Sequence, residues 1–375
     1  MERDNVLIIG LGNLGGHVLD MLTRRSPSPK VTVAGRNYPY LHQRANLSTL
    51  VAMQLGFNPE VECVEMDVNN IDQTTQTIAR VQPSIIFSTL SLQAWWVINE
   101  LPKPVFEELD EAQIGPWLPM QLTLIYKLMQ AVKQSGLDIK VVNAALPDAT
   151  HAILDKVGLA PTIGVGNVAN VIPALRKTVA AKLDKPVTDV QIYFVTEAYV
   201  SHRIPRFGNA GGAPFHFTAL VRGEDVTDQL DMETLFDLLP TKFKRLGGVT
   251  GSVLTAASAM TVIDPMLNDT PSLTHAPGPN GLIGGYPVMI TATGGKVVLP
   301  NGLSMEEAVR INEACLKFDG IERIEKDGSV VYTEREMSIV KKMLGYECRK
   351  MRLEESEERA KELAAKYAEF RDKYR

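Results

Sequence analysis

Apolar and polar positions follow two different periods along the first 167 residues. Short apolar runs, which are typical of buried parallel strands, alternate with longer stretches in which apolar residues recur at helical spacing. The runs fall at residues 6–9, 31–34, 61–66, 84–90, 139–143 and 161–165. Six strands that alternate with helices predict a doubly wound parallel sheet, an α/β Rossmann domain over residues 1–167.

After residue 167 the pattern changes. An amphipathic helix at 168–183 precedes two long alternating segments, 189–200 and 214–222, which we predict as an antiparallel pair joined by a polar, glycine-rich loop at 201–212. Further expected elements are a helix at 250–261, a strand at 286–292, a helix at 304–316 and a hairpin at 320–332. This mixture predicts a second, α+β domain over residues 168–333 for substrate binding and dimerisation.

Residues 334–375 are highly charged, and their apolar residues recur at helical spacing. Oppositely charged pairs four residues apart, such as Glu357 with Lys361 and Glu362 with Lys366, support a helix. We therefore predict one long C-terminal helix. Its apolar stripe has two candidate partners, the first domain or another subunit.

Composition narrows the classes of protein that remain. With 45% hydrophobic residues the 375-residue chain can fill two cores, and its net charge of −5 with no basic tract argues against a nucleic-acid partner. No apolar run reaches the length of a membrane span, and residues 1–5 leave no room for a signal peptide, so we expect a cytoplasmic protein without a membrane partner. Three widely spaced cysteines fit a reducing compartment and no metal site.

The first apolar run ends at a glycine-rich turn with the spacing G-x-G-x-x-G. Gly10 suits the tight turn, Gly12 allows the backbone to approach a pyrophosphate, and Gly15 allows the next helix to pack closely on the strand. Asn13 and Leu14 begin that helix, whose N-terminus would hold the phosphates. Because a strand precedes the turn and a helix follows it, we predict dinucleotide binding here.

The ends of the next strands offer further contacts for a dinucleotide. Arg36 and Asn37 follow the second strand, where an NAD-binding protein usually has a carboxylate, and a guanidinium there favours the 2′-phosphate of NADP. A solvated surface arginine is the alternative. Asp67 and Val68 follow the third strand and either line the adenine pocket or cap the next helix. Thr89 ends the fourth strand, where a nicotinamide ribose would pass.

Two segments near the carboxyl ends of later strands have more than one interpretation. Residues 91–119 form an insertion that contains all three tryptophans, which is either a lid, a subunit contact or part of the core. Asp148 follows the fifth strand and is well placed to cap the next helix, and His151 one turn later is typical of a surface position.

A nicotinamide supplies its own hydride, so the protein needs an acid or base for the substrate and a cation for its carboxylate. In the predicted loop, His202 is a candidate acid, and Arg203 or Arg206 is a candidate clamp for a carboxylate. A solvated or interface loop is the alternative. Glu197 on the preceding strand and His275 beside a run rich in glycine and proline are further catalytic candidates.

The glycine turn, Gly35-Arg36-Asn37 and Asp67-Val68 together resemble the saccharopine dehydrogenase-like reductases and their opine dehydrogenase relatives over about the first 170 residues. The resemblance implies an NADP-type Rossmann domain and an α+β substrate domain that often dimerises. It also implies reduction of amino-acid-derived imines or keto acids between the two domains. No motif of the family assigns a catalytic residue beyond residue 180.

The sequence therefore predicts an NADP(H)-dependent oxidoreductase that reduces a C=O or C=N bond of a small carboxylate, and that forms a homodimer. One alternative is a synthase that holds a nicotinamide tightly without net redox. The other is a regulatory protein that senses NADPH and catalyses no reaction.

Overall fold

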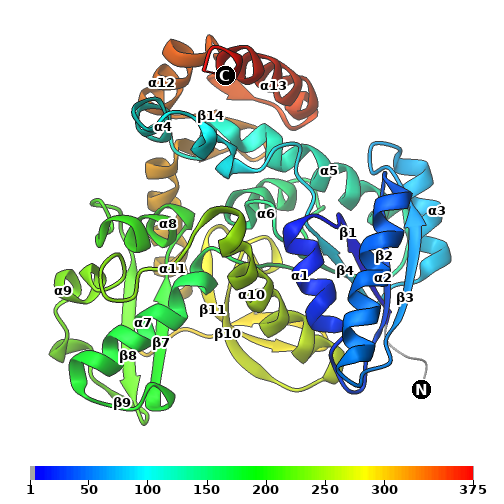
Figure 1. The fold of residues 1–375 in the computed structure, drawn as a ribbon. Helices are drawn as coiled ribbons and strands as arrows, with labels where there is room; N and C mark the ends of the chain where they lie inside the picture. Colours follow the sequence, from blue (N-terminus) through cyan, green and yellow to red (C-terminus); the bar gives the residue numbers. More distant parts are fainter. Residues whose placement is uncertain (1–4, 375) are drawn as a thin grey trace.

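The computed structural model describes residues 5–374, and its first part is a six-stranded parallel sheet in the order β3-β2-β1-β4-β5-β6 (Figure 1). The strands are β1 (Asn5–Ile9), β2 (Lys30–Gly35), β3 (Glu60–Glu65), β4 (Ile85–Ser88), β5 (Lys140–Asn143) and β6 (Ile163–Gly164). The order reverses direction between β1 and β4, which is the arrangement of a doubly wound sheet. The predicted Rossmann architecture is confirmed.

Helices cover both faces of this sheet. They are α1 (Asn13–Leu22), α2 (Tyr38–Gln54), α3 (Ile71–Val81), α5 (Leu118–Ser135) and α6 (Pro147–Asp155). Leu7 and Ile9 of β1 belong to the hydrophobic cluster on the side of α5, whereas Val6 and Ile8 belong to the cluster on the side of α1. Because both faces of β1 are buried, the strand is apolar throughout.

The second part of the chain contains three small antiparallel sheets with helices around them. The sheets are β7-β8-β9 (Val190–Val195, His216–Val221, Glu224–Asp225), β10-β11-β12 (Ser272–Pro277, Gly285–Thr291, Gly294–Val297) and β13-β14-β15 (Ile321–Ile324, Val330–Tyr332, Lys350–Met351). The helices are α7 (Val168–Leu183), α8 (Ala198–Phe207), α9 (Met232–Asp237), α10 (Gly248–Asn268), α11 (Met305–Leu316), α12 (Glu334–Leu344) and α13 (Ser356–Asp372). The predicted α+β character of this part is confirmed.

Helix α10 lies beside α1 of the Rossmann sheet (Figure 1). Val18 and Leu22 of α1 share one hydrophobic cluster with Ala256 and Ile263 of α10. The second domain therefore does not have a fully separate core, because its longest helix completes the core on one face of the sheet.

The predicted antiparallel pair is confirmed, but the strand predicted over 189–200 ends at Val195, and the first part of the loop predicted over 201–212 is helical. β7 ends at Val195, and Glu197 caps helix α8 by accepting a hydrogen bond from the Tyr199 amide at 2.8 Å. Ala198, Ser201 and Ile204 are buried at helical spacing along one face of α8. The segment is an amphipathic helix, and its polar residues lie on the other face.

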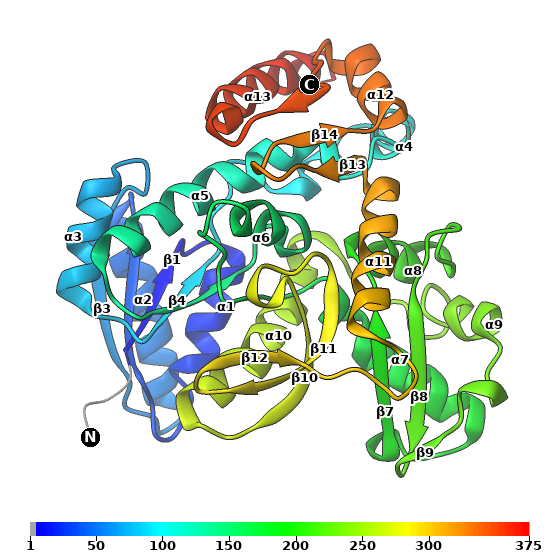
Figure 2. The same cartoon turned by 180° about the vertical axis from the view of Figure 1, so that it is seen from behind.

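The predicted C-terminal helix is divided into α12 and α13. Gly345 ends α12 with a positive φ of 72°, and the chain then adds strand β15 to β14 before α13 begins. Seen from behind, α12 and α13 lie over α5 and over α4 (Lys103–Asp110) of the insertion (Figure 2).

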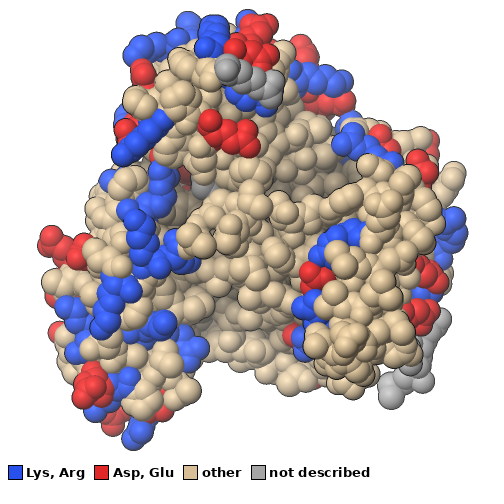
Figure 3. Space-filling model, viewed as in Figure 1, with Lys and Arg blue, Asp and Glu red and all other residues tan. Residues whose placement is uncertain are grey.

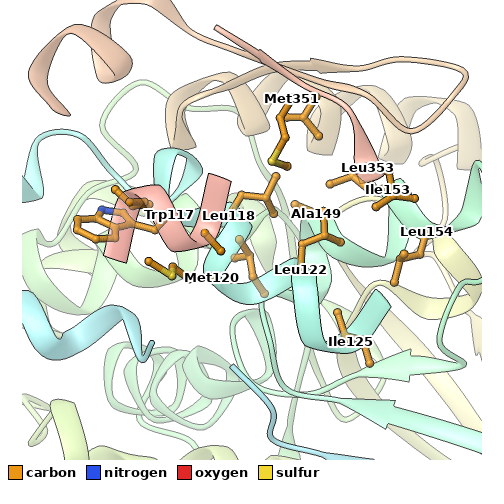
Figure 4. Close-up of a cluster of buried hydrophobic side chains, with 14 of the residues drawn as sticks. Trp117, Leu118, Met120, Leu122, Ile125, Ala149, Ile153, Leu154, Met351 and Leu353 are labelled. Atoms are coloured by element: carbon orange, nitrogen blue, oxygen red, sulfur yellow. The ribbon is translucent and has the colours of Figure 1, made fainter. Parts of the chain in front are cut away.

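The apolar stripe of α13 packs on the first domain of the same chain. Tyr367 meets Trp117 edge to face with a ring centroid distance of 5.4 Å, and its hydroxyl donates to the Val97 carbonyl at 3.2 Å. In the adjoining core, side chains of α5 and α6 point toward those of the C-terminal segment (Figure 4). Those labelled are Trp117, Leu118, Met120, Leu122, Ile125, Ala149, Ile153, Leu154, Met351 and Leu353. Trp117 is thus a core residue of the insertion.

Candidate functional site

A cavity of about 1090 Å³ lies at the carboxyl ends of the six strands β1 to β6. Its walls come from the turns after these strands, from the insertion before α5, from α8 and from the start of α10. The hollow between these parts is visible in Figure 3, where Lys and Arg side chains gather along the side on which α8 lies. In open α/β sheets, this edge is the place where ligands bind.

The glycine turn after β1 forms the floor of one end of the cavity. A Cβ at Gly10, which has a φ of +93°, would lie 2.7 Å from the Thr89 hydroxyl, and a Cβ at Gly15 would overlap the Gly10 carbonyl oxygen. A Cβ at Gly12 would meet no atom within 4 Å, so it would occupy open space in the cavity. Asn13 and Leu14 begin α1, which has no side-chain cap on its first N–H groups. These groups are available to an anion.

The residues predicted for the adenosine end all line the cavity, namely Arg36, Asn37, Asp67 and Val68. The Asn37 side chain caps α2 by accepting from the Tyr40 amide at 3.1 Å. Asp67 accepts from the Asn69 amide at 3.0 Å, which closes a tight turn after β3. Arg36 is exposed and forms no ion pair within residues 5–374. Thr89 braces the glycine turn by donating to the Gly10 carbonyl at 2.8 Å.

Helix α8 brings His202 and Arg206, four residues apart, to the opposite wall of the cavity. Arg206 forms two hydrogen bonds with the Asp110 carboxylate of α4, at 3.3 and 2.5 Å. Arg203 does not line this cavity; its guanidinium lies over the Phe207 ring at 4.9 Å and donates to Asn209 at 3.1 Å. Of the two arginines proposed as a clamp, Arg206 is therefore the one at the cavity.

Burial, together with the nearby positive charges of Arg206 and Arg245, lowers the pKa of His202 to about 4. The imidazole is therefore neutral at pH 7. It can donate one hydrogen bond and accept another, but it does not carry the charge expected of an acid that works near neutral pH.

Glu197 and His275 lie outside the wall of the cavity. Glu197 is fully buried as the cap of α8. His275 belongs to β10, where its Nε2 accepts from the Phe194 amide at 3.2 Å and burial lowers its pKa to about 3. Both side chains therefore bind backbone amides and do not face this cavity.

His151 is buried and lies away from the surface, contrary to expectation. Its Nδ1 is 2.7 Å from the Gly278 carbonyl oxygen, and its Nε2 is 3.2 Å from the Asn143 side-chain amide. Burial lowers the pKa of His151 to about 4. Asp148 does not cap α6 either, because the N-cap position belongs to Leu146.

Several cavity residues were not predicted from the sequence. Lys244 and Arg245 precede the glycine pair that starts α10, and both line the cavity. Together with Arg36 and Arg206, they bring the number of Lys and Arg side chains in the wall to four. Asp67 is the single acidic residue among the described lining residues. The break before α10 was visible in the sequence, but its position opposite the first glycine turn depends on tertiary packing.

The chain is similar in structure to two-domain dehydrogenases. A lactate dehydrogenase from Cryptosporidium parvum, solved with lactic acid and β-nicotinamide adenine dinucleotide, matches with a TM-score of 0.57 and 14% identity over 85% of this chain and 96% of that one. A lactate dehydrogenase from Eimeria maxima, solved with NADH and oxamate, matches with a TM-score of 0.56 and 12% identity, over 84% of this chain and 92% of that one. A malate dehydrogenase from Plasmodium falciparum matches with a TM-score of 0.56 and 14% identity, over 84% of this chain and 96% of that one.

At this identity the likeness shows the fold, which is a Rossmann domain joined to a second domain. No protein-family model and no curated protein sequence matches the chain. Among residues 5–374 no helix is both long and apolar enough to cross a membrane, and no group of three or more His, Cys, Asp or Glu side chains is arranged to hold a metal ion.

The lowered pKa of His202 leads to a first prediction. A histidine NMR titration of the folded protein should show His202 titrating near pH 4, and Arg206→Gln should raise this pKa because a neighbouring positive charge is lost. Arg222→Gln, which removes an exposed guanidinium outside the cavity wall, should leave it unchanged. A His202 that titrates at about 6.5 in the unaltered protein would contradict the half-buried, neutral imidazole.

Proposed function

We propose that this protein is an NADP(H)-dependent oxidoreductase that reduces a C=O or C=N bond of a small carboxylate or amino-acid-derived substrate. One observation carries the proposal: a single cavity joins a glycine turn that fits a dinucleotide to a cationic wall supplied by the second domain. The two-domain dehydrogenase fold supports it, since the lactate dehydrogenases named above were solved with NADH or nicotinamide adenine dinucleotide.

The residues at the first end of the cavity fit a dinucleotide. The open space at Gly12 and the uncapped N–H groups of α1 would hold the pyrophosphate. Arg36 would hold the 2′-phosphate of NADP, while Asp67 and Val68 border the adenosine and Thr89 the nicotinamide ribose. When bound, the nicotinamide supplies a hydride.

The residues at the other end fit an anionic substrate. Arg206, Lys244 and Arg245 lie on this wall, and a substrate carboxylate would compete with Asp110 for the two N–H groups of Arg206. The neutral imidazole of His202 would hold a proton beside the reacting carbonyl or imine. The saccharopine and opine dehydrogenase-like resemblance remains our prediction for the substrate class.

A direct test is oxidation of NADPH over a panel of 2-keto acids, each with and without amino acids. We expect turnover with at least one keto acid or with a mixture of keto acid and amino acid. Binding of NADPH without turnover on the whole panel would instead favour the non-catalytic sensor. Gly12→Ala is the matched control: it should fold normally because the added methyl group meets no atom within 4 Å. It should also weaken dinucleotide binding about tenfold or more by blocking the pyrophosphate.

Arg36 leads to a prediction about cofactor choice. Arg36→Asp should weaken NADPH binding by about 10- to 100-fold, the value of a charge-assisted hydrogen bond, and should spare NADH. Fluorescence titration with both nucleotides measures this. Arg80→Asp, the same charge change on the exposed face of α3, should affect neither nucleotide. Equal losses for NADPH and NADH would show that Arg36 does not recognise the 2′-phosphate.

We further propose that the protein is a homodimer that pairs through α2. Leu47, Leu50, Met53 and Leu55 are each more than half exposed on or just after this helix. The surface over α2 forms a broad area without charge in Figure 3. Such a contiguous apolar face marks an interface, and a second copy meets it with the same residues across a twofold axis.

Leu50→Glu should convert the dimer to a monomer, because it places a charge in the centre of the apolar face. Sedimentation velocity measures the mass in solution. Gln76→Glu on the exposed part of α3 adds the same charge elsewhere and should leave the dimer intact. A monomer in the unaltered protein would exclude this interface.

A further inference from the structure

Three carboxyl side chains lie together behind the substrate end of the cavity, and none of them lines it. Asp148 belongs to α6, Glu197 precedes α8, and Asp319 ends the helical turn that follows α11. Each side chain is at most 1% exposed. The group therefore joins the Rossmann domain to two separate segments of the second domain.

Each carboxyl binds a segment of the chain that forms a wall of the cavity. Asp148 accepts from the side-chain amide of Asn167, a cavity residue whose φ of +45° lies in the left-handed region. Asp319 accepts from the amide of Ile114, a cavity residue of the insertion, at 3.4 Å.

Glu197 holds the third wall. It caps α8 at the Tyr199 amide, and α8 presents His202 and Arg206 to the cavity. The three acids thus anchor the three segments that surround the proposed substrate.

The remaining oxygen of each carboxyl is buried without a normal hydrogen-bond partner in residues 5–374. These atoms are Asp148 Oδ1, Glu197 Oε1 and Asp319 Oδ2. The described chain provides no Lys, Arg or His ion pair to any of the three acids. Three buried carboxylates without a cation would be strongly unfavourable, so protons must occupy some of these oxygens.

Glu197 and Asp319 lie close enough for the charge of Asp319 to raise the pKa of Glu197. Two ionised carboxylates this close repel each other and cannot donate a hydrogen bond, so a proton on one of them relieves the repulsion. Pairs of close carboxyl groups that share one proton are a known consequence of like-charge repulsion.

The other titratable groups around the three acids do not supply a positive charge. Tyr199 of α8, Tyr286 of β11 and Cys315 of α11 face the group, and burial raises the pKa of each. Glu336 of α12 adds negative charge near Asp319, and it is itself paired with Arg335 at 2.9 Å.

We propose that Asp148, Glu197 and Asp319 are positioning residues that share protons and thereby hold the cavity walls together. Ionisation of the group would place repelling charges between the Asn167 turn, α8 and the insertion. The arrangement of the substrate end therefore depends on pH. The proposal rests on the proposed function only in calling this part of the cavity the substrate end. Its test does not require the protein to turn over a substrate.

The direction of the pH dependence follows from burial. It raises the pKa of Asp148 to about 7 and that of Asp319 to about 8, and it raises the pKa of Glu197, with the neighbouring acids adding to the effect. In the unfolded chain these groups titrate near about 4. The folded protein therefore binds more protons than the unfolded chain between these values. Stability is fully present below about pH 4 and is lost as the pH rises toward about 8.

The test follows backbone and side-chain amides by NMR across this pH range in the full-length protein. The Tyr199 and Ile114 amides and the Asn167 side-chain amide each donate to one of the acids, so their shifts should change together near neutral to mildly alkaline pH. In Asp319→Asn the Tyr199 midpoint should move to lower pH by about one unit or more, because a like charge next to Glu197 is removed.

Glu336→Gln is the matched control, because Glu336 is also buried but has a cation partner. It should leave the coupled change of Tyr199 and Asn167 in place. A Tyr199 midpoint that Asp319→Asn leaves unchanged would overturn the proposal.

A second measurement does not depend on the variants folding. Infrared spectra of the unaltered protein at neutral pH should show the carbonyl stretch of buried protonated carboxyl groups, and this band should disappear at alkaline pH. Absence of the band at neutral pH would overturn the proposal, whatever the outcome of the NADPH experiments. Loss of NADPH binding or turnover with the band present would overturn only the proposed function.

Discussion

The architecture depends on one close backbone contact, between the turn after β1 and the first turn of α1. A Cβ at Gly15 would overlap the Gly10 carbonyl oxygen, so only glycine lets α1 lie this close to the strand. The contact fixes where the open N–H groups of α1 point. It also fixes α10, which packs along α1 through Ala256 and Ile263. The walls that the second domain adds to the cavity are therefore positioned relative to the glycine turn.

The sheet could be predicted from the sequence because strands buried on both faces are continuous apolar runs, and glycine spacing marks where the first one ends. Elements that depend on distant contacts could not be predicted. The segment after Val195 alternates like a strand, yet Glu197 caps a helix there and Ile204 is buried at helical spacing. In the C-terminal region, Gly345 breaks a charged helical pattern because the chain must return to pair with β14.

Some residues of the cavity could likewise be predicted from the local sequence, whereas others are brought there only by tertiary packing. The end that we propose binds a dinucleotide consists of residues next to strand ends, such as Arg36 and Asp67, so their place in the cavity could be predicted from the order of the strands. Its other end combines α8, the insertion and the turn before α10, and Lys244 carries no local signal of its position. The buried acids were equally hidden: Asp148 has the sequence context of a helix cap, and only tertiary packing shows its carboxyl against Asn167.

Because Val18 of α1 and Ala256 of α10 belong to one hydrophobic cluster, the two domains cannot swing apart without exposing a core to water. Wide hinge opening of the kind seen in binding proteins with separate lobes is therefore too costly here. The turn at residues 244–248 also borders the cavity, but it lies outside that core and is exposed throughout. It can therefore move on the timescale of loops without exposing the core, which rotation of whole domains cannot do.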